Sequence, residues 1–476
     1  MFSTRLLAES RLTSRRRAVR GSLNVFPKLL DPLHEESPLH SRQKRSQTVA
    51  VIGLGYVGLP LALLAKKQKF NVMGIDTDSK KIRAIAHGRS PFRDEAIERA
   101  LAAEGKDGLR ATTRFHAVEQ AGIVVVCVPT PVTEDHVPDL APLEQACRSV
   151  APYLRPETLV VIESSIYPGT TETVIKPILE KGSGLSVAAG ELFLAHCPER
   201  INPGDNHWRV GNLPRVVGGV NRESTEQASA FYRRLLPQGA VKEMSSVAEA
   251  EAVKMVENAF RDVNIAFVNE LAIAFEKWGI NILHVIDGAS TKPFAFLPHY
   301  PGCGVGGHCI PVDPYYLIER ARESQVPLHL IETARAVNNS MPAHTVDLTL
   351  QATDRLGLKP AETTVVVLGL AYKADTDDER ESPSHEIIHL LETRRFPVVV
   401  YDPYLAHPAL SAPSLAQALS RSVVVILATA HREFLRALTP EFLVRQGIRA
   451  VIDGRNCLRG QEIKKAGIAY QGIGLS

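Results

Sequence analysis

Short apolar runs alternate with amphipathic stretches along most of this 476-residue chain. A first series of strand-like and helix-like segments starts at Thr48 and continues to about residue 222, and a second series starts at Thr363. Strands that alternate with helices are typical of parallel, doubly wound sheets. The pattern therefore predicts an α/β protein with two Rossmann-like, doubly wound domains. The strand-like runs are TVAVIG (48–53), NVMGID (71–76), GIVVVCVP (122–129), TLVVIESS (158–165), LFLAHC (192–197), RVVGGV (215–220), TTVVVLGLAY (363–372), PVVVYDPY (397–404), SVVVILATAH (422–431) and AVIDGRN (450–456).

The stretch between the two series has a helical pattern. No Gly or Pro interrupts the chain from Ser246 to Lys277, which predicts one long helix that ends at Trp278. Residues 280–340 are also mostly helical in pattern, apart from a Gly- and Pro-rich loop at 298–314. We therefore divide the chain into an N-terminal extension (1–47), a first α/β domain (48–222), a central helical domain (223–340) and a second α/β domain (341–476).

The N-terminal extension differs from the rest of the chain in charge. It holds ten Lys or Arg and four Asp or Glu, a net charge of +6, whereas the whole chain has +3 and the remainder therefore −3. An Arg- and Ser-rich start is one feature of an organelle transit peptide. The extension has little apolar periodicity, which favours instead a disordered tail or a start codon placed too early.

Composition restricts the class of protein. The body of the chain has no general basic character, so nucleic-acid binding has no support. The sequence contains no run of about 18 apolar residues, so it does not predict a transmembrane helix. The six cysteines are scattered and form no CxxC pair, which argues against a zinc site and fits a reducing compartment. We therefore expect a cytoplasmic protein without a metal, a nucleic-acid partner or a membrane partner.

A glycine-rich motif follows the first predicted strand. Gly53, Gly55 and Gly58 form a GxGxxG pattern, which permits a tight turn and close approach of a pyrophosphate to a helix N-terminus. Asp76 ends the second predicted strand, where a carboxylate binds a ribose 2′-hydroxyl and repels a 2′-phosphate. The pattern predicts an NAD site; the alternative is a turn needed only for packing. Lys81 is either a contact to the adenosine half of NAD or a solvated surface lysine.

A second glycine-rich segment precedes a cysteine. Four glycines fall within residues 302–307, just before Cys309. Because packing alone rarely needs so many glycines, we expect backbone N–H groups there to close round an anion or a crowded substrate. A thiol beside such donors and a cation can have a depressed pKa and act as a nucleophile. The alternative is an inert buried cysteine.

Polar residues share one face of the long predicted helix. Lys254, Asn258 and Arg261 fall at i, i+4 and i+7. A lysine and an amide together can polarise an oxygen that acquires negative charge. The alternative is a solvated polar stripe.

Together these motifs resemble the UDP-glucose/GDP-mannose dehydrogenase family of nucleotide-sugar 6-dehydrogenases. The resemblance covers residues 48 to about 470, and its blocks occur in the family's order. It implies an NAD-dependent oxidoreductase that oxidises C6 of a nucleotide sugar from alcohol to carboxylate with two NAD+. It also implies a homodimer or higher homo-oligomer. The blocks are VIGLGYVGLPLA (51–62), CVPTP (127–131), ESSIYPGTT (163–171), CPERINPG (197–204), KMVENAFRDVNIAFVNEL (254–271), GVGGHCIPVDP (304–314) and LGLAYKADTDDERESPS (368–384).

The resemblance also implies catalytic roles. Cys309 is the nucleophile that adds to the C6 aldehyde, forming a thiohemiacetal and then a thioester. Lys254 and Asn258 stabilise the C6 oxyanion, and Asp313 helps to order the lysine or a water. Glu199 activates the water that hydrolyses the thioester.

Contact residues are implied in the same way. Ser165 stands where many relatives have threonine, and it keeps the hydroxyl. The implied NAD contacts are Gly53, Gly55, Tyr56, Val57, Gly58, Asp76, Lys81, Thr130, Ser165 and Arg380. The implied UDP-sugar contacts are Arg200, Ile201, Arg261, Gly306 and Lys373.

The implied sugar is a UDP-N-acetylhexosamine. The segments PERINPG (198–204), GGHCI (306–310) and STKPFAFLPHYPG (290–302) resemble relatives that act on UDP-N-acetylglucosamine, whereas UDP-glucose members carry PEFL and GG(S/Y)C. UDP-N-acetylmannosamine members usually have an arginine in the third segment; Lys292 is a candidate replacement here. Phe294 or Phe296 is expected to supply an apolar contact to the acetamido group.

Other functions remain as alternatives. UDP-N-acetylmannosamine and UDP-glucose are alternative substrates for the same chemistry. A non-catalytic nucleotide-binding module and a hydroxyacid dehydrogenase are alternatives of other classes, but neither needs a cysteine in the glycine loop.

Overall fold

The computed structural model describes residues 47–92, 94–103, 108–133, 135–200, 210–237 and 239–475, which belong to one compact unit. The predicted N-terminal extension thus lies outside the described residues, apart from Gln47. None of the described helices is both long enough and apolar enough to cross a membrane.

The first sheet has eight strands among the described residues, in the order β3-β2-β1-β4-β5-β6-β7-β8. Neighbouring strands pair in parallel, except that β6 and β7 are antiparallel. Strands β1, β4 and β5 are buried along their whole length, as expected for a parallel sheet covered on both faces. The strands are β1 (Thr48–Ile52), β2 (Asn71–Ile75), β3 (Arg110–Thr112), β4 (Ile123–Val126), β5 (Thr158–Ile162), β6 (Leu192–His196), β7 (Arg215–Gly219) and β8 (Val241–Glu243).

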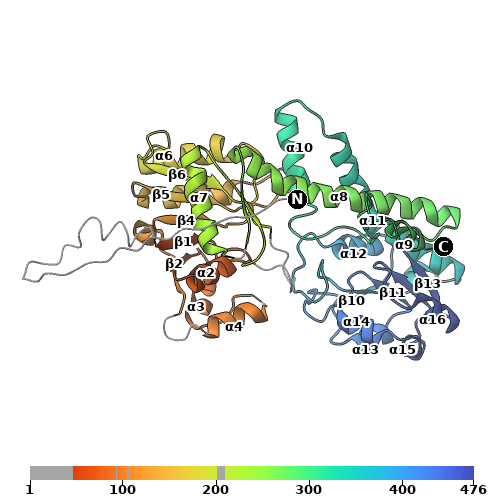
Figure 1. The fold of residues 1–476 in the computed structure, drawn as a ribbon. Helices are drawn as coiled ribbons and strands as arrows, with labels where there is room; N and C mark the ends of the chain where they lie inside the picture. Colours follow the sequence, from red (N-terminus) through yellow and green to blue (C-terminus); the bar gives the residue numbers. More distant parts are fainter. Residues whose placement is uncertain are drawn as a thin grey trace, which may run out of the picture. The chain divides into compact units, whose positions relative to one another are not determined.

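Helices cover both faces of this sheet (Figure 1). One apolar cluster joins the sheet to α2, α3, α4 and α7, and a second cluster on the other face joins it to α5, η4 and α6. The carboxyl ends of the parallel strands are left for ligands. These helices are α2 (Gly58–Lys67), α3 (Ser79–Ala86), α4 (Glu95–Ala103), α5 (Ala141–Val150), η4 (Thr171–Ile175), α6 (Lys176–Ser183) and α7 (Arg222–Leu235), and η2 (Phe115–Gln120) and η3 (Ala151–Tyr153) are short 3₁₀ turns.

The long helix predicted from the sequence is α8 (Val247–Trp278). The Ser246 hydroxyl caps its first turn by accepting from the Glu249 N–H, and Gly279 ends it with φ +72°. Helix α8 packs on β7 and on α10 and α11. The other central helices are α9 (Ile282–Ser290), α10 (Asp313–Glu323) and α11 (His329–Arg355).

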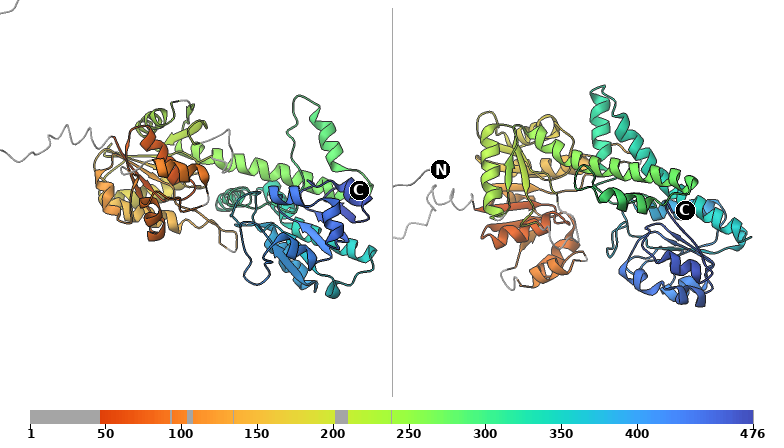
Figure 2. Two further views of the ribbon diagram at one scale, coloured as in Figure 1. Left: turned by 90° about the horizontal axis from the view of Figure 1, so that it is seen from below. Right: turned by 45° about the vertical axis from the view of Figure 1, so that its right-hand side comes forward.

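The second sheet, drawn in blue in Figure 2, has the order β10-β9-β11-β12-β13 and is parallel throughout. One face packs on α8, α9, α11 and α12, and the other on α13 to α16. The strands are β9 (Val365–Leu368), β10 (Val398–Tyr401), β11 (Val424–Leu427), β12 (Ala450–Asp453) and β13 (Ala469–Gly472). The helices are α12 (Pro383–Thr393), α13 (Leu415–Ser420), α14 (Arg432–Ala437), α15 (Pro440–Arg445) and α16 (Gly460–Lys465), with a 3₁₀ turn, η5 (Pro360–Glu362), before β9.

The two sheets begin in the same way. A glycine with positive φ follows the first strand of each, Gly53 (+90°) and Gly369 (+97°). The N–H of the next residue donates to the aspartate that follows the neighbouring strand, Asp76 at 2.8 Å and Asp402 at 2.7 Å. The α/β class and the two Rossmann-like domains predicted from the sequence are confirmed.

Two details differ from the sequence-based description. Strand β7 is antiparallel to β6, so the first sheet is not wholly parallel. The sheet also extends past residue 222 to β8, and helix α11 runs across residue 340.

Candidate active site

The loop after β1 has room for a pyrophosphate. A Cβ on Gly53 would lie 2.7 Å from the Cys127 carbonyl oxygen, and a Cβ on Gly58 would lie 1.9 Å from the Gly53 oxygen. These two glycines are needed for the turn itself. A Cβ on Gly55 would meet nothing within 4 Å, so the surface there is open beside the N-terminus of α2.

Asp76 lies at the edge of this loop and is 8% exposed. Its carboxylate accepts from the N–H groups of Leu54 (2.8 Å) and Asp78 (2.9 Å). The Lys81 ammonium lies 3.3 Å from the same carboxylate. The donors hold the carboxylate at the position from which it can bind a ribose hydroxyl.

We expect NAD+ to be preferred over NADP+ by about 30-fold or more in kcat/KM, because the Asp76 carboxylate would repel a 2′-phosphate by roughly 2 kcal/mol or more. Steady-state kinetics with both cofactors checks this. In Asp76→Asn the ratio of kcat/KM for NAD+ to that for NADP+ should fall, because asparagine keeps the shape of the side chain but has no negative charge. Equal efficiency of the wild-type enzyme with both cofactors would contradict the assignment.

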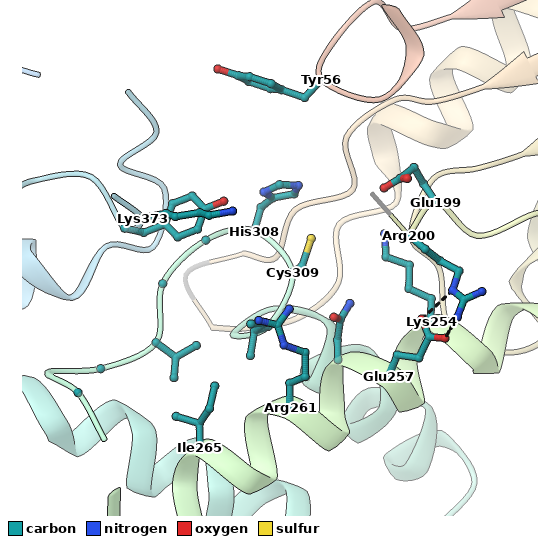
Figure 3. A pocket seen from close by; sticks show the side chains of 18 of the residues that line it. Tyr56, Glu199, Arg200, Lys254, Glu257, Arg261, Ile265, His308, Cys309 and Lys373 are labelled. Atoms are coloured by element: carbon teal, nitrogen blue, oxygen red, sulfur yellow. Dashed lines mark hydrogen bonds and ion pairs between the residues drawn. The ribbon is translucent and has the colours of Figure 1, made fainter. Parts of the chain in front are cut away.

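A pocket of about 500 Å³ lies beside Cys309 (Figure 3). In this view the side chains of Cys309, Lys254 and Glu199 point toward one space. Segments from all three parts of the chain line the pocket, although they are far apart in sequence. The lining residues are Tyr56, Val57, Glu199, Arg200, Lys254, Glu257, Asn258, Arg261, Ile265, Tyr300, Gly302, Gly304, Val305, Gly306, Gly307, His308, Cys309, Ile310, Tyr372, Lys373 and Arg455.

Three of the glycines before Cys309 also allow close packing, a role that the sequence analysis did not expect. A Cβ on Gly306 or Gly307 would lie 2.7 Å from Tyr372 atoms, and one on Gly304 would lie 2.9 Å from Pro383. The loop can therefore approach the segment after β9 only without side chains. Gly306 still lines the pocket, as predicted for a substrate contact.

The Cys309 thiol is not acidic in this structure, so the expected depressed pKa is wrong. Burial raises its pKa to about 11, although the Lys254 ammonium acts in the opposite direction. Burial would lower the pKa of Lys254, but nearby Cys309, Asp313 and Glu199 raise it on balance. At neutral pH the site therefore holds a protonated thiol beside a charged ammonium.

Asp313 acts on the amide of the site. It is 1% exposed at the start of α10, and its Oδ2 accepts from Asn258 Nδ2 at 2.6 Å. Burial raises the pKa of Asp313 to about 6, against the effects of Lys254 and the Asn258 hydrogen bond. Asp313 thus meets Asn258, which lines the same pocket as Lys254. Asp313 was expected to order the lysine or a water, whereas the hydrogen bond found here is to the amide of Asn258.

Behind Glu199 lies a buried cluster that the sequence analysis did not identify. The Arg215 guanidinium lies 3.8 Å from both Glu163 and Glu199, and Tyr232 donates to Glu163 at 2.5 Å. Arg215 and Glu163 are each 1% exposed. A buried charge is tolerated when opposite charges surround it. Glu163 follows β5 directly and begins the block ESSIYPGTT, but neither feature indicated a buried cluster of charges.

Arg200 forms an ion pair inside the pocket, drawn as dashed lines in Figure 3. Its Nε donates to Glu257 Oε2 at 3.0 Å, and its Nη2 donates to Glu257 Oε1. Its Nη1 donates to the Pro214 carbonyl at 3.0 Å. Glu257 was not identified from the sequence, although it lies on the same face of α8 as Lys254 and Arg261.

Three family models match the chain in succession. They are the NAD binding domain (residues 47–236), the central domain (248–340) and the UDP binding domain (366–460) of the UDP-glucose/GDP-mannose dehydrogenase family. The chain belongs to this family. It is therefore an NAD-dependent nucleotide-sugar dehydrogenase, as the resemblance implied.

Individual relatives agree with this. A UDP-N-acetyl-D-mannosamine dehydrogenase of Pyrococcus horikoshii is 36% identical over 427 residues, 90% of this chain and 99% of that protein. Its solved structure superposes with a TM-score of 0.83. A UDP-N-acetyl-D-glucosamine 6-dehydrogenase of Pseudomonas aeruginosa is 37% identical over 392 residues, 81% of this chain and 91% of that protein.

The first α/β domain of this family member is the NAD-binding domain, which confirms NAD as the cofactor. Tyr56 and Val57 line the pocket, and Arg380 lies with its Cζ 6.0 Å from the Tyr56 ring centre. Arg380 also donates to Asp378 at 2.6 and 2.8 Å. Two further predicted NAD contacts, Thr130 and Ser165, follow β4 and β5 but do not line this pocket.

The second α/β domain is the UDP-binding domain. Lys373 from this domain and Arg261 from α8 both line the pocket, as expected for contacts to a diphosphate. Arg455 also lines it and is held by donation from its Nε to the Ala428 carbonyl at 2.7 Å. The sequence analysis missed Arg455, because it lies outside the blocks that carried the resemblance.

The expected sugar-binding segment only partly reaches the pocket. Tyr300 lines it, whereas Phe294 is 67% exposed with the Lys292 ammonium 4.8 Å above its ring. Phe296 packs on the core below the second sheet. The predicted apolar contacts from Phe294 and Phe296 are therefore not present in the pocket described here, and Ile201 lies outside the described residues.

Proposed function

We propose that this chain oxidises C6 of a UDP-N-acetylhexosamine to the uronic acid and uses two NAD+ per sugar. The observation that carries the proposal is the pocket in which Cys309 shares one space with Lys254, Asn258 and Glu199. Oxidation of an alcohol to an aldehyde needs no thiol. A cysteine is needed when the aldehyde is carried on to the acid, because a nucleophile must first add to the carbonyl carbon.

UDP-N-acetylglucosamine is the favoured substrate. The names of the relatives reported above support an N-acetylhexosamine, and they include both the gluco and the manno sugar. The absence of an arginine from residues 290–302 favours the gluco sugar over UDP-N-acetylmannosamine. UDP-N-acetylmannosamine remains the alternative, and UDP-glucose is the next one.

Cys309 carries the intermediate. Removal of a hydride from C6 and a proton from its hydroxyl gives the aldehyde, to which the sulfur adds while the oxygen takes up a proton. Loss of a second hydride from C6, together with the proton of the hydroxyl on C6, turns this thiohemiacetal into a thioester. Bound NAD+ supplies the hydride acceptor in both oxidations. The thiol must lose its proton as the C–S bond forms, and the charged Lys254 nearby favours that loss.

Lys254 and Asn258 stabilise the oxygen on C6. Lys254 is 8% exposed, so its charge acts through little solvent. The Asn258 amide is oriented by its 2.6 Å hydrogen bond to Asp313, and this removes the cost of reorienting it during the reaction.

Glu199 activates the water that cleaves the thioester. It is 5% exposed, lines the pocket and lies 3.8 Å from the buried Arg215 guanidinium. A carboxylate at this place in the pocket can accept a proton from the water that attacks C6.

The amount of NADH formed per UDP-sugar consumed tests this function. Two NADH per sugar, with the highest kcat/KM for UDP-N-acetylglucosamine in a panel with UDP-N-acetylmannosamine and UDP-glucose, is the expected result. One NADH would indicate a simple alcohol dehydrogenase of the hydroxyacid type. No NADH with any of the three sugars would indicate a non-catalytic nucleotide-binding module.

We also propose that the enzyme is a cytoplasmic homodimer. Val256, Phe260 and Phe267 are 50–58% exposed on one side of α8, opposite the side of Lys254 at about 100° per residue. Exposed apolar stripes of this kind are typical of protein interfaces. All six cysteines are free, which fits a reducing compartment.

Phe267→Glu is expected to convert the dimer to a monomer, because a carboxylate would be buried without a partner in the interface. Light scattering of the wild-type and variant proteins measures the mass. Leu330→Glu, at a residue on α11 that is 70% exposed, is the control and should leave the mass unchanged. A wild-type monomer, or a Phe267→Glu dimer, would refute the proposed interface.

A further inference from the structure

The segment that carries Glu199 is tied to its surroundings at several points. Before Glu199, the Cys197 N–H donates to the Ile162 carbonyl at 3.0 Å, and the Pro198 carbonyl accepts from Arg215 Nη1 at 3.4 Å. After Glu199, Arg200 is tied twice, by its ion pair with Glu257 and by donation from its Nη1 to the Pro214 carbonyl at 3.0 Å. Of these two ties, the ion pair is the one that joins the segment to helix α8.

The donors of Arg200 are directed at the protein. Each of its three nitrogens donates to a protein oxygen, two of them to the Glu257 carboxylate and one to the Pro214 carbonyl. A bidentate arginine–carboxylate pair fixes both distance and orientation. Arg200 was expected to contact the UDP-sugar. In this structure it instead binds Glu257, and we call this ion pair the Arg200–Glu257 clamp.

Glu257 belongs to helix α8, which also carries the catalytic amine of Lys254. It lies on α8 three residues after Lys254 and directly before Asn258. Helix α8 is 32 residues long and packs along its length on other helices, so it is a rigid support. The pair therefore links the segment of Glu199 to the helix that carries Lys254 and Asn258.

We propose that Glu257 is a positioning residue for thioester hydrolysis and acts through Arg200 on Glu199. This inference rests on the proposed function. In the hydrolysis step, water gives a proton to Glu199 while its oxygen attacks C6. The C–S bond then breaks, and the Cys309 sulfur leaves as a thiolate that is reprotonated. A water-activating carboxylate must lie within hydrogen-bond reach of the water, and a displacement of about 1 Å can cost about 100-fold in rate.

The two hydride removals do not use Glu199. Loosening the clamp should therefore slow hydrolysis and leave the earlier steps nearly unchanged. The thioester would accumulate on Cys309, which a general loss of stability or of substrate affinity would not produce. The side chains of Arg200 and Glu257 are 25% and 38% exposed, and ion pairs of this kind contribute little to folding. The variants are thus expected to fold.

Rapid mixing of Glu257→Gln with UDP-N-acetylglucosamine and NAD+ tests the proposal. We expect a burst of two NADH per active site, followed by a steady-state rate that is about 10- to 100-fold below the wild type. Intact-mass spectrometry of the quenched enzyme should show the sugar nucleotide bound covalently at Cys309. Glu243→Gln, which removes the partner of Arg233 from an exposed ion pair, is the control and should behave like the wild type.

A charge exchange provides the second test. Arg200→Glu combined with Glu257→Arg restores an ion pair and should recover hydrolysis at least in part, whereas Arg200→Gln alone should resemble Glu257→Gln. A raised KM for the sugar without covalent accumulation would overturn the proposal, since it would place the pair in direct contact with substrate. An unchanged Glu257→Gln enzyme would overturn it as well. Failure of the wild type to reduce NAD+ with any UDP-sugar would instead reject the proposed function itself.

Discussion

Cys309→Ser is expected to lower four-electron turnover by about 10³-fold or more. Serine is nearly isosteric but has almost no anion at neutral pH, so it adds poorly to the aldehyde. The measurement is NADH formed per sugar together with mass analysis of the product. We expect at most slow release of the aldehyde or its hydrate and no covalent intermediate.

Cys303→Ser is the matched control for this variant. Cys303 lies in the same loop, but it is fully buried and its thiol donates to the Ala428 carbonyl at 3.5 Å. A serine hydroxyl can donate the same hydrogen bond. Its activity should remain close to the wild type. Full turnover of Cys309→Ser would disprove the covalent mechanism, and loss of activity in Cys303→Ser with an unaltered thermal melt would identify a different thiol as the nucleophile.

Lys254→Met is expected to lower kcat by about 10²- to 10³-fold, the effect of removing one donor that stabilises an oxyanion. Methionine keeps most of the length of the side chain, and the buried site gains an apolar group in place of a charge. Binding of the UDP-sugar, measured by calorimetry, should change much less than kcat, because the charge on the C6 oxygen develops only during the reaction.

The reactivity of the Cys309 thiol provides an independent measure of the loss of the Lys254 charge. Loss of the Lys254 ammonium should raise the thiol pKa further, so alkylation by iodoacetamide should become slower at a given pH. Lys465→Met, on the exposed surface of α16, controls for loss of a positive charge. An unchanged kcat in Lys254→Met would show that another group stabilises the oxyanion.

Much of the fold could be predicted because it depends on local patterns. Strands β1, β4 and β9 are continuous apolar runs, and the helix α8 has a serine cap and a glycine end that are visible in the sequence. The short strand β3 and the antiparallel pairing of β7 could not be predicted. Their pairing depends on neighbours that are distant in the chain, and three to five residues carry little periodicity.

Residue types and spacing by themselves predicted the glycine turn, its aspartate, the polar face of α8 and a candidate nucleophile at Cys309. Those features follow from backbone geometry and from chemistry that few residue types can perform. Only the tertiary structure decided that Gly306 and Gly307 pack against Tyr372, and that burial raises the pKa of the Cys309 thiol. Only the tertiary structure also paired Arg200 with Glu257, across 57 positions of the sequence. Burial and ion pairing depend on segments that meet only when the domains pack, and no local pattern encodes them.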